Sequence, residues 1–298
     1  MSARTANTMT LATGTQTPAI YGNWINGTGT TLTGTGNISF AGRGSQTITS
    51  AGKTFTQQIV IDSPSGSVTL QDAFVNSISG SRLTLNSGTF SDGGYSVTLS
   101  GTATGSGFNL TSTAYTSLAT INGVWTIAGS GTAWNTAVGI ASMSVSGTGT
   151  ISLTSASAKT FGGGGLSYSG ITLDQGGAGA LTISGNNTFK DITNSYSATG
   201  ATSIAFAATT QTLTQFTATG ASGKVLTLSG TSAASPATLI LSSGTVSTPD
   251  YLTINNVRAY PLTTTWYAGA NSTNGGSLGW YFAAAVVFSY LGNFFAFF

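Results

Sequence analysis

The sequence has no cysteine, no histidine and no glutamate, and only eight Lys or Arg and six Asp carry charge among its 298 residues. Without cysteine there is neither a disulfide framework nor thiol chemistry. The absence of both Cys and His also removes the usual zinc, copper and iron ligand sets. The net charge is only +2 and its basic residues are scattered, so the chain lacks an electrostatic footprint for nucleic acid. We therefore expect no metal, no cofactor and no nucleic-acid partner.

Glycine is abundant instead, at 42 residues, and Ser and Thr fill much of the remainder. Disorder normally goes with few apolar residues and a high net charge. Here 40% of residues are hydrophobic, and 15 Phe, 10 Tyr and 5 Trp need burial, which predicts a folded chain with a sizeable core. Residues 1–18 are polar and Thr-rich, without the apolar run of a secretory signal. We expect the chain to be made in the cytoplasm of its host and kept there until assembly or lysis.

Short apolar–Thr–apolar triplets recur along the chain, and Gly, Ser, Asn or Asp follows within a few residues of most of them. Their alternation has the period of two that is typical of a half-buried strand. In residues 220–256 the apolar runs follow one another too closely for a crossover helix between them. The triplets lie at residues 68–70, 83–85, 97–99, 125–127, 171–173, 181–183, 226–228 and 252–254.

This pattern predicts an all-β protein, a right-handed parallel β-helix (β-solenoid) of irregular coils. Coils of about 20–25 residues, spaced by ~4.8 Å, tolerate uneven triplet spacing because corner loops differ in length. A β-sandwich is the alternative, but its outward faces usually carry Lys and Glu, which are rare or absent here. We predict an N-terminal arm and entry strand in residues 1–26, the β-helix in 27–265, and a C-terminal cap and apolar tail in 266–298.

Four segments of the chain resemble a family of Gly/Thr-rich β-helix proteins of tailed bacteriophages and prophages. They are residues 39–74, 146–165, 173–189 and 266–280. The resemblance implies a non-enzymatic virion structural protein: a tail fibre, spike or capsid-decorating appendage used for host-surface adhesion or particle stabilisation. It also implies a homo-oligomer, with a homotrimer as the state of many phage fibres. The expected partners are other virion proteins and a host-surface glycan, and the expected location is the virion.

The C-terminal residues 280–298 depart from that family, whose chains typically stop after a Gly-Trp-aromatic-Phe motif. They form 19 residues without a charge, close to the length of a membrane-spanning helix. No Lys or Arg flanks them, and Ser289, Gly292 and Asn293 interrupt them. Three interpretations remain open: a plug on the coil stack or between subunits, which we favour; insertion into a neighbouring virion protein; or a membrane segment. The assembly hypothesis concerns Trp280, Tyr281, Phe282, Phe288, Tyr290, Phe294, Phe295, Phe297 and Phe298.

A glycan-cleaving tailspike is the alternative function, and it needs two carboxylates a few ångström apart or a carboxylate with a strong base. Most of the six Asp lie beside turn residues, which predicts that they bind their own backbone. Asp62 and Asp92, placed on neighbouring coils, are the one candidate pair. Because neither Glu nor His is present to assist them, we predict no catalytic residue and no enzyme. The six are Asp62, Asp72, Asp92, Asp174, Asp191 and Asp250.

A third alternative is a cellular adhesin or an ice-binding β-solenoid. Thr-x-Thr runs, such as those from Thr28 to Thr35 and at Thr47 and Thr49, are the pattern of ice-binding ladders. Such a ladder needs even coil spacing, which the sequence does not have, and Thr is in any case a good strand residue. The run Gly162–Gly165 lacks the Lys-Ser/Thr of a phosphate loop and predicts a corner.

Three aromatic residues are candidates for stacking on sugars if they lie on exposed loops. For each of them, packing in the core or at a corner is the favoured prediction. They are Tyr115, Trp134 and Tyr168.

Overall fold

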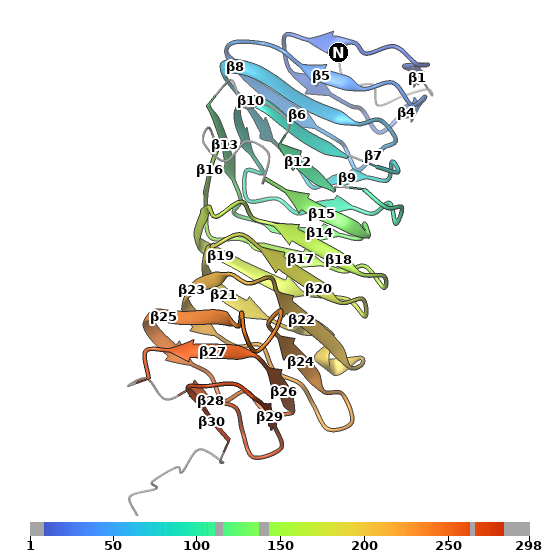
Figure 1. Ribbon diagram of the computed structural model, residues 1–298. Helices are drawn as coiled ribbons and strands as arrows, with labels where there is room; N and C mark the ends of the chain where they lie inside the picture. The colour runs from blue at the N-terminus through green and yellow to red at the C-terminus, as the bar shows by residue number, and fades with distance from the viewer. Residues whose placement is uncertain are drawn as a thin grey trace, which may run out of the picture.

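The computed structural model describes residues 9–80, 82–105, 107–110, 116–136, 143–262 and 266–282. These residues contain thirty β-strands and one short 3-10 turn at Ser195–Ala198. The strands pair in parallel with partners in the coils before and after, and they form an elongated β-solenoid of about 11 turns (Figure 1). The predicted parallel β-helix is confirmed, and the β-sandwich alternative is wrong because a sandwich is built from antiparallel sheets.

Each coil runs across three faces, which we name first, second and third in chain order. On the first face lie β1 (Met9–Ala12), β4 (Thr30–Thr33), β7 (Thr54–Phe55), β9 (Phe74–Asn76), β11 (Val97–Leu99), β14 (Val124–Ile127), β17 (Thr150–Leu153), β28 (Trp266–Tyr267) and β30 (Trp280–Tyr281). On the second face lie β2 (Ala19–Ile20), β5 (Ile38–Phe40), β12 (Phe108–Leu110), β15 (Gly131–Asn135), β18 (Lys159–Gly162), β20 (Leu181–Ser184), β22 (Thr202–Phe206), β24 (Leu226–Ser229), β26 (Leu252–Asn255) and β29 (Thr273–Gly275).

The third face contains β3 (Trp24–Ile25), β6 (Ser45–Thr49), β13 (Ser117–Thr120), β16 (Met143–Ser146) and β27 (Val257–Tyr260). Strands β1, β2 and β3 form a first coil within the segment predicted as the N-terminal arm and entry strand. They pair with β4, β5 and β6 of the second coil.

Six longer strands turn a corner without a break, and the corner that they turn changes along the rod. The strands β8 (Ile59–Leu70) and β10 (Leu83–Ser91) pass from the second face to the third. Nearer the C-terminus the continuous corner lies between the third face and the first face of the next coil. It is formed by β19 (Ser167–Gln175), β21 (Thr188–Thr193), β23 (Thr210–Phe216) and β25 (Ala237–Val246).

Coil length is uneven, as the sequence predicted, although the range is wider. The register places Trp266 opposite Trp280, 14 residues further on, and Phe216 opposite Val246, 30 residues further on. The added residues lie at corners between strands. The run Gly162–Gly165 is one of these corners, where Gly164 and Gly165 have φ of 66° and 78°.

Aromatic side chains stack on one another along the interior of the coils. Trp134 lies 4.2 Å from Phe108 and 5.7 Å from Phe161, measured between ring centroids, and the ring of Tyr168 packs against both Trp134 and Phe161. Trp134 and Tyr168 are fully buried, so their predicted packing in the core is confirmed and neither is available to a sugar. Tyr115 lies outside the described residues.

A substitution at Gly88 tests how tightly the corner between β8 and β10 is stacked. Gly88 has φ of 84°, and a Cβ there would lie 2.1 Å from the carbonyl oxygen of Ser63. Gly52 has a similar φ of 70° but nothing within 4 Å of the added Cβ. We expect Gly88→Ala to lose about 1–3 kcal/mol more stability than Gly52→Ala, because only its clash pushes two coils apart. Thermal and denaturant unfolding followed by circular dichroism would measure this, and equal losses would contradict it.

Candidate functional site

The C-terminal end of the rod is the part that the assembly hypothesis addresses. β30 pairs in parallel with β28, which places Trp280 beside Trp266. The ring of Trp280 lies 5.1 Å from that of Trp266 and 5.8 Å from that of Phe216. Its Nε1 donates to the carbonyl oxygen of Val257 at 3.0 Å. Trp280 therefore packs against the end of the core, and Phe282 packs against it too.

Six other residues of that hypothesis lie outside the described residues: Phe288, Tyr290, Phe294, Phe295, Phe297 and Phe298. Within the described part of the chain, no helix has the length and apolar character needed to cross a bilayer.

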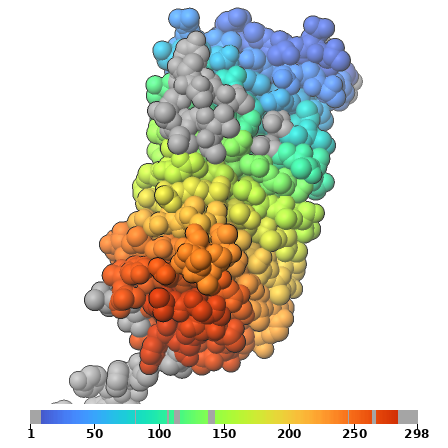
Figure 2. Space-filling model, in the orientation of Figure 1, coloured from blue at the N-terminus to red at the C-terminus, as the bar shows by residue number. Residues whose placement is uncertain are grey.

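Exposed apolar side chains gather in the last coils. Seven large hydrophobic residues are exposed in the described part of the chain, and four of them lie between residues 260 and 281. Tyr281 is 54% exposed, and its ring packs on Tyr267 at 5.6 Å. The others are Tyr260, Leu262 and Leu278. The described residues of the range 260–281 belong to the red and orange region at the lower end of Figure 2. An apolar end of this kind is typical of an interaction surface.

The structure does not bring Asp62 and Asp92 together. Asp62 lies opposite Ser87, whose hydroxyl donates to it at 3.0 Å, whereas Asp92 lies five residues further on, at the next corner. Asp92 is fully buried, and its carboxylate accepts hydrogen bonds from the backbone N–H of Gly94, in its own turn, and from the next coil. Those donors are the N–H groups of Asn122 and Gly123 and Nε1 of Trp125, at 2.8–2.9 Å.

Besides Asp250, which accepts from the N–H and Nδ2 of Asn271 at 2.9 and 2.7 Å, three further carboxylates also join neighbouring coils. Asp72 accepts from the N–H groups of Ser50 and Ala51, both at 2.7 Å. Asp174 accepts from the hydroxyls of Ser152 and Ser195 at 2.6 and 2.7 Å.

The third of these, Asp191, accepts from the N–H and hydroxyl of Thr217 at 3.0 and 2.6 Å. Burial raises the pKa of Asp191, and the hydrogen bonds from Thr217 oppose that shift. Carboxylates used in this way hold coils in register and are not free for acid–base chemistry.

Two cations are buried against backbone carbonyl groups at the corner between the first and second faces. Nζ of Lys159 lies 2.6 Å from the carbonyl oxygen of Gly179 and 3.2 Å from that of Ser155. Burial lowers the pKa of Lys159 to about 8, although nearby Asp174 raises it.

The second buried cation, Arg82, donates from Nη2 to the carbonyl oxygen of Gly101. A Cβ on Gly101 would lie 2.7 Å from that nitrogen, and a Cβ on Gly129 would lie 2.9 Å from Nη1. These two glycines therefore make the space that the guanidinium group occupies. Within the described residues, no group of three or more Asp, Glu, His or Cys side chains could hold a metal ion.

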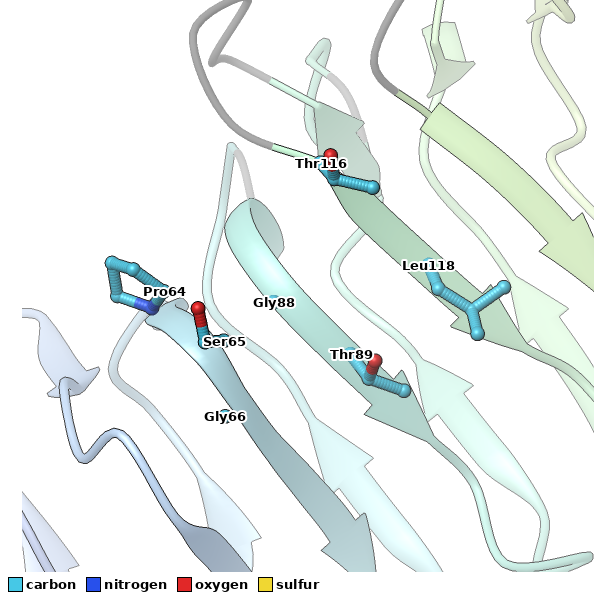
Figure 3. A pocket seen from close by; sticks show the side chains of 7 residues that line it. All are labelled: Pro64, Ser65, Gly66, Gly88, Thr89, Thr116 and Leu118. Carbon is cyan, nitrogen blue, oxygen red and sulfur yellow. The ribbon is translucent and has the colours of Figure 1, made fainter.

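The described surface has a shallow pocket of about 420 Å³ where β8 and β10 turn from the second face to the third (Figure 3). It contains the hydroxyls of Ser65, Thr89 and Thr116 and no ionisable side chain. Such a pocket can form hydrogen bonds, but its lining supplies no base to activate the hydroxyls and no acid. Pro64, Gly66, Gly88 and Leu118 complete its lining.

A second, mainly apolar pocket of about 380 Å³ lies at the N-terminal end of the rod, lined by Leu11, Ala12, Thr13, Gln16, Pro18, Ile20 and Trp24.

The geometry defines the class of protein as a β-solenoid. Most of its described ionisable groups form hydrogen bonds within the fold and between its coils. Comparison of the chain with protein-family models, with curated proteins and with solved structures gives no match.

The Asp92 carboxylate is expected to be a strong stabilising contact. Asp92→Ala should cost more than about 3 kcal/mol, because several buried donors lose their partner at about 1–3 kcal/mol each. Asp62→Ala removes one hydrogen bond at a half-exposed site and should cost less than about 1 kcal/mol. Denaturant unfolding of both variants measures the difference, and similar losses would show that Asp92 does not hold the coils together.

The buried lysine makes stability depend on pH. Unfolded lysine has a pKa of about 10.4, whereas Lys159 in the fold has a pKa of about 8. Between these values the unfolded chain binds more protons, so the free energy of unfolding rises with pH. The gain in the free energy of unfolding is complete near pH 10.4. It decreases as the pH is lowered and is gone once the pH has fallen through 8. Lys159→Met should remove this contribution, and Lys190→Met, at an exposed site, should keep the wild-type slope. Unfolding curves from pH 7 to 10 test it, and equal slopes in all three proteins would contradict it.

Proposed function

We propose that this chain is a bacteriophage virion structural protein, a fibre, spike or capsid-decorating appendage. The observation that carries the proposal is the use of ionisable groups. Asp72, Asp92, Asp174 and Asp191 bind the neighbouring coil, and Lys159 is buried among backbone carbonyls. What is left outside is a nearly uncharged rod of Ser, Thr, Asn and Gly, which suits a role in architecture better than one in chemistry. The resemblance of residues 39–74 and 146–165 to phage β-helix proteins supports the same proposal.

The mechanism is the display of a stiff, neutral surface to a host cell or to neighbouring subunits. Few surface charges limit both the salt sensitivity of a contact and non-specific adsorption to other molecules. The hydroxyl-lined pocket beside Thr89 offers hydrogen bonds to a neutral partner such as a host-surface glycan. Hydrolysis of that glycan is disfavoured, because the described carboxylates that would be needed are hydrogen-bonded between coils.

Self-association is assigned to the C-terminal end in this proposal. Tyr281, Leu278 and Leu262 are each more than half exposed there. In the sequence, residues 283–298 follow this end; they carry no charge and are rich in Phe. Burial of this end between subunits would remove apolar surface from water, the main driving force of stable assembly.

The test compares the full chain with a chain that ends at Phe282. This truncation keeps β30 and the contact of Trp280 with the core, so the described coils stay closed. We expect the full chain to be a discrete oligomer by mass photometry and the truncated chain to be a folded monomer. We also expect antibodies against the chain to label gradient-purified phage particles from its source. A full chain that is monomeric, and absent from such particles, would overturn the proposal, and release of new reducing ends from host polysaccharide would favour a glycan-cleaving tailspike.

A further inference from the structure

The third face presents a regular set of hydroxyl side chains on five consecutive coils. Two outward positions, separated by one inward residue, come from each of five strands: β6, β8, β10, β13 and β16. Nine of the ten outward residues are Ser or Thr and none is charged. We call this set the hydroxyl array: Ser45, Thr47, Ser67, Thr69, Thr89, Ser91, Leu118, Thr120, Ser144 and Ser146.

The array is in register although the coils differ in length. The outward residues form two rows, or ranks, that run from strand to strand across the face. In the first rank each residue is the register partner of the next: Ser45, Ser67, Thr89, Leu118 and Ser144. The second rank is formed in the same way by Thr47, Thr69, Ser91, Thr120 and Ser146. The register shifts between β8 and β10 end at Thr89, where the array begins on that strand. The unequal corners therefore do not disturb this face, so the uneven spacing expected from the sequence does not apply to it.

The repeat distances of the array follow from strand geometry. Neighbouring strands lie about 4.7–4.9 Å apart, and two outward residues on one strand are about 6.6–6.8 Å apart. The two ranks thus form a small rectangular lattice of hydroxyl groups.

The array is held on a rigid base. The inward residues of the same strands, among them Ile48, Val68, Leu70 and Phe90, are buried in the core. Side chains also contact one another across coils, with 3.4 Å between the hydroxyls of Ser67 and Ser45. The same contact between Thr120 and Ser146 is 3.1 Å.

Towards the C-terminus the third face carries Ile240 and Arg258 at outward positions, in β25 and β27. The array is therefore limited to the N-terminal half of the rod.

A dissolved ligand that meets only the open rows of hydroxyls, outside the pocket beside Thr89, gains little binding free energy from such a surface. A hydroxyl that binds a solute gives up a hydrogen bond to water, and the net gain of each exchange is only about 0.5–1.5 kcal/mol. Sugar sites add aromatic stacking, but the one aromatic ring in the strands that form the array, that of Phe90, is buried in the core. Many equal, weak contacts on a fixed lattice add up only for a ligand that repeats with the same spacing. Such a ligand is itself a lattice. An ice surface is such a lattice of hydrogen-bonding oxygen atoms.

We propose that the hydroxyl array is an ice-binding surface, which orders water molecules in two ranks and joins them to a growing ice crystal. The inference goes beyond the proposed virion function and does not depend on it, because it rests on the register and rigidity of this one face.

The test is inhibition of ice recrystallisation by the full chain, with a charged side chain introduced into the array. Thr69→Lys replaces an outward residue between the buried residues Val68 and Leu70. The matched control is Thr182→Lys in β20 on the second face, between the buried residues Leu181 and Ile183. We expect the wild type and Thr182→Lys to slow the growth of ice grains equally, and Thr69→Lys to lose this effect.

A second variant keeps the test independent of folding. Ser144→Lys lies at a more exposed position of the same array and should also lose activity while its circular dichroism and melting curve stay those of the wild type. A wild type that leaves ice growth at the rate of buffer would overturn the proposal. So would equal activity of Thr69→Lys and Thr182→Lys. If the wild type is inactive on ice and Thr69→Lys weakens its retention on neutral polysaccharide beads, the array is a glycan surface instead.

Discussion

Parallel hydrogen bonding between successive coils is the constraint from which the rest of this structure follows. The N–H and C=O groups of a strand find their partners 14–30 residues away, so each coil must repeat the path of the previous one. Inward positions then stack on inward positions, which is why Phe108, Trp134 and Phe161 follow one another in register. Close stacking at the corners also excludes side chains, as at Gly88, where a Cβ would meet the backbone of the previous coil.

Corners are where this arrangement needs polar side chains. A turn interrupts the ladder and leaves N–H groups without a backbone partner, and buried donors of this kind are costly. Asp92 accepts from two such N–H groups of the following coil, and Asp72 accepts from two of the preceding coil. Lys159 does the reverse, because its ammonium group donates hydrogen bonds to backbone carbonyl groups. The low charge of the sequence is consistent with this use, because a solenoid of this kind needs only a few ionisable groups at defined corners.

The sequence was sufficient to predict the fold class but not the polar contacts. Triplets such as Leu181-Thr182-Ile183 show strand period and direction of burial, since both are local properties. For Trp134, packing in the core or at a corner was the favoured prediction, and the residue lies in the core. The partners of Asp92 lie about 30 residues away, and nothing near it in the chain identifies them. For the same reason the pair Asp62 and Asp92 was proposed from coil adjacency alone, whereas the register separates the two. The hydroxyl array was missed because unequal corners conceal the register of the third face.

Because the coils are unequal in length and each is joined only to its neighbours, the rod is expected to respond to mechanical force in a particular way. Under tension applied to its two ends, a solenoid yields where a terminal coil detaches, because an interior coil is held on both sides. The register offset between successive coils is 14–30 residues, so each detached coil releases about 45–110 Å of extended length at ~3.3–3.6 Å per residue. The pairing of Phe216 with Val246 spans the longest piece, and the pairing of Trp266 with Trp280 spans the shortest. The rod therefore dissipates force in a fixed series of unequal steps, without a single point of rupture.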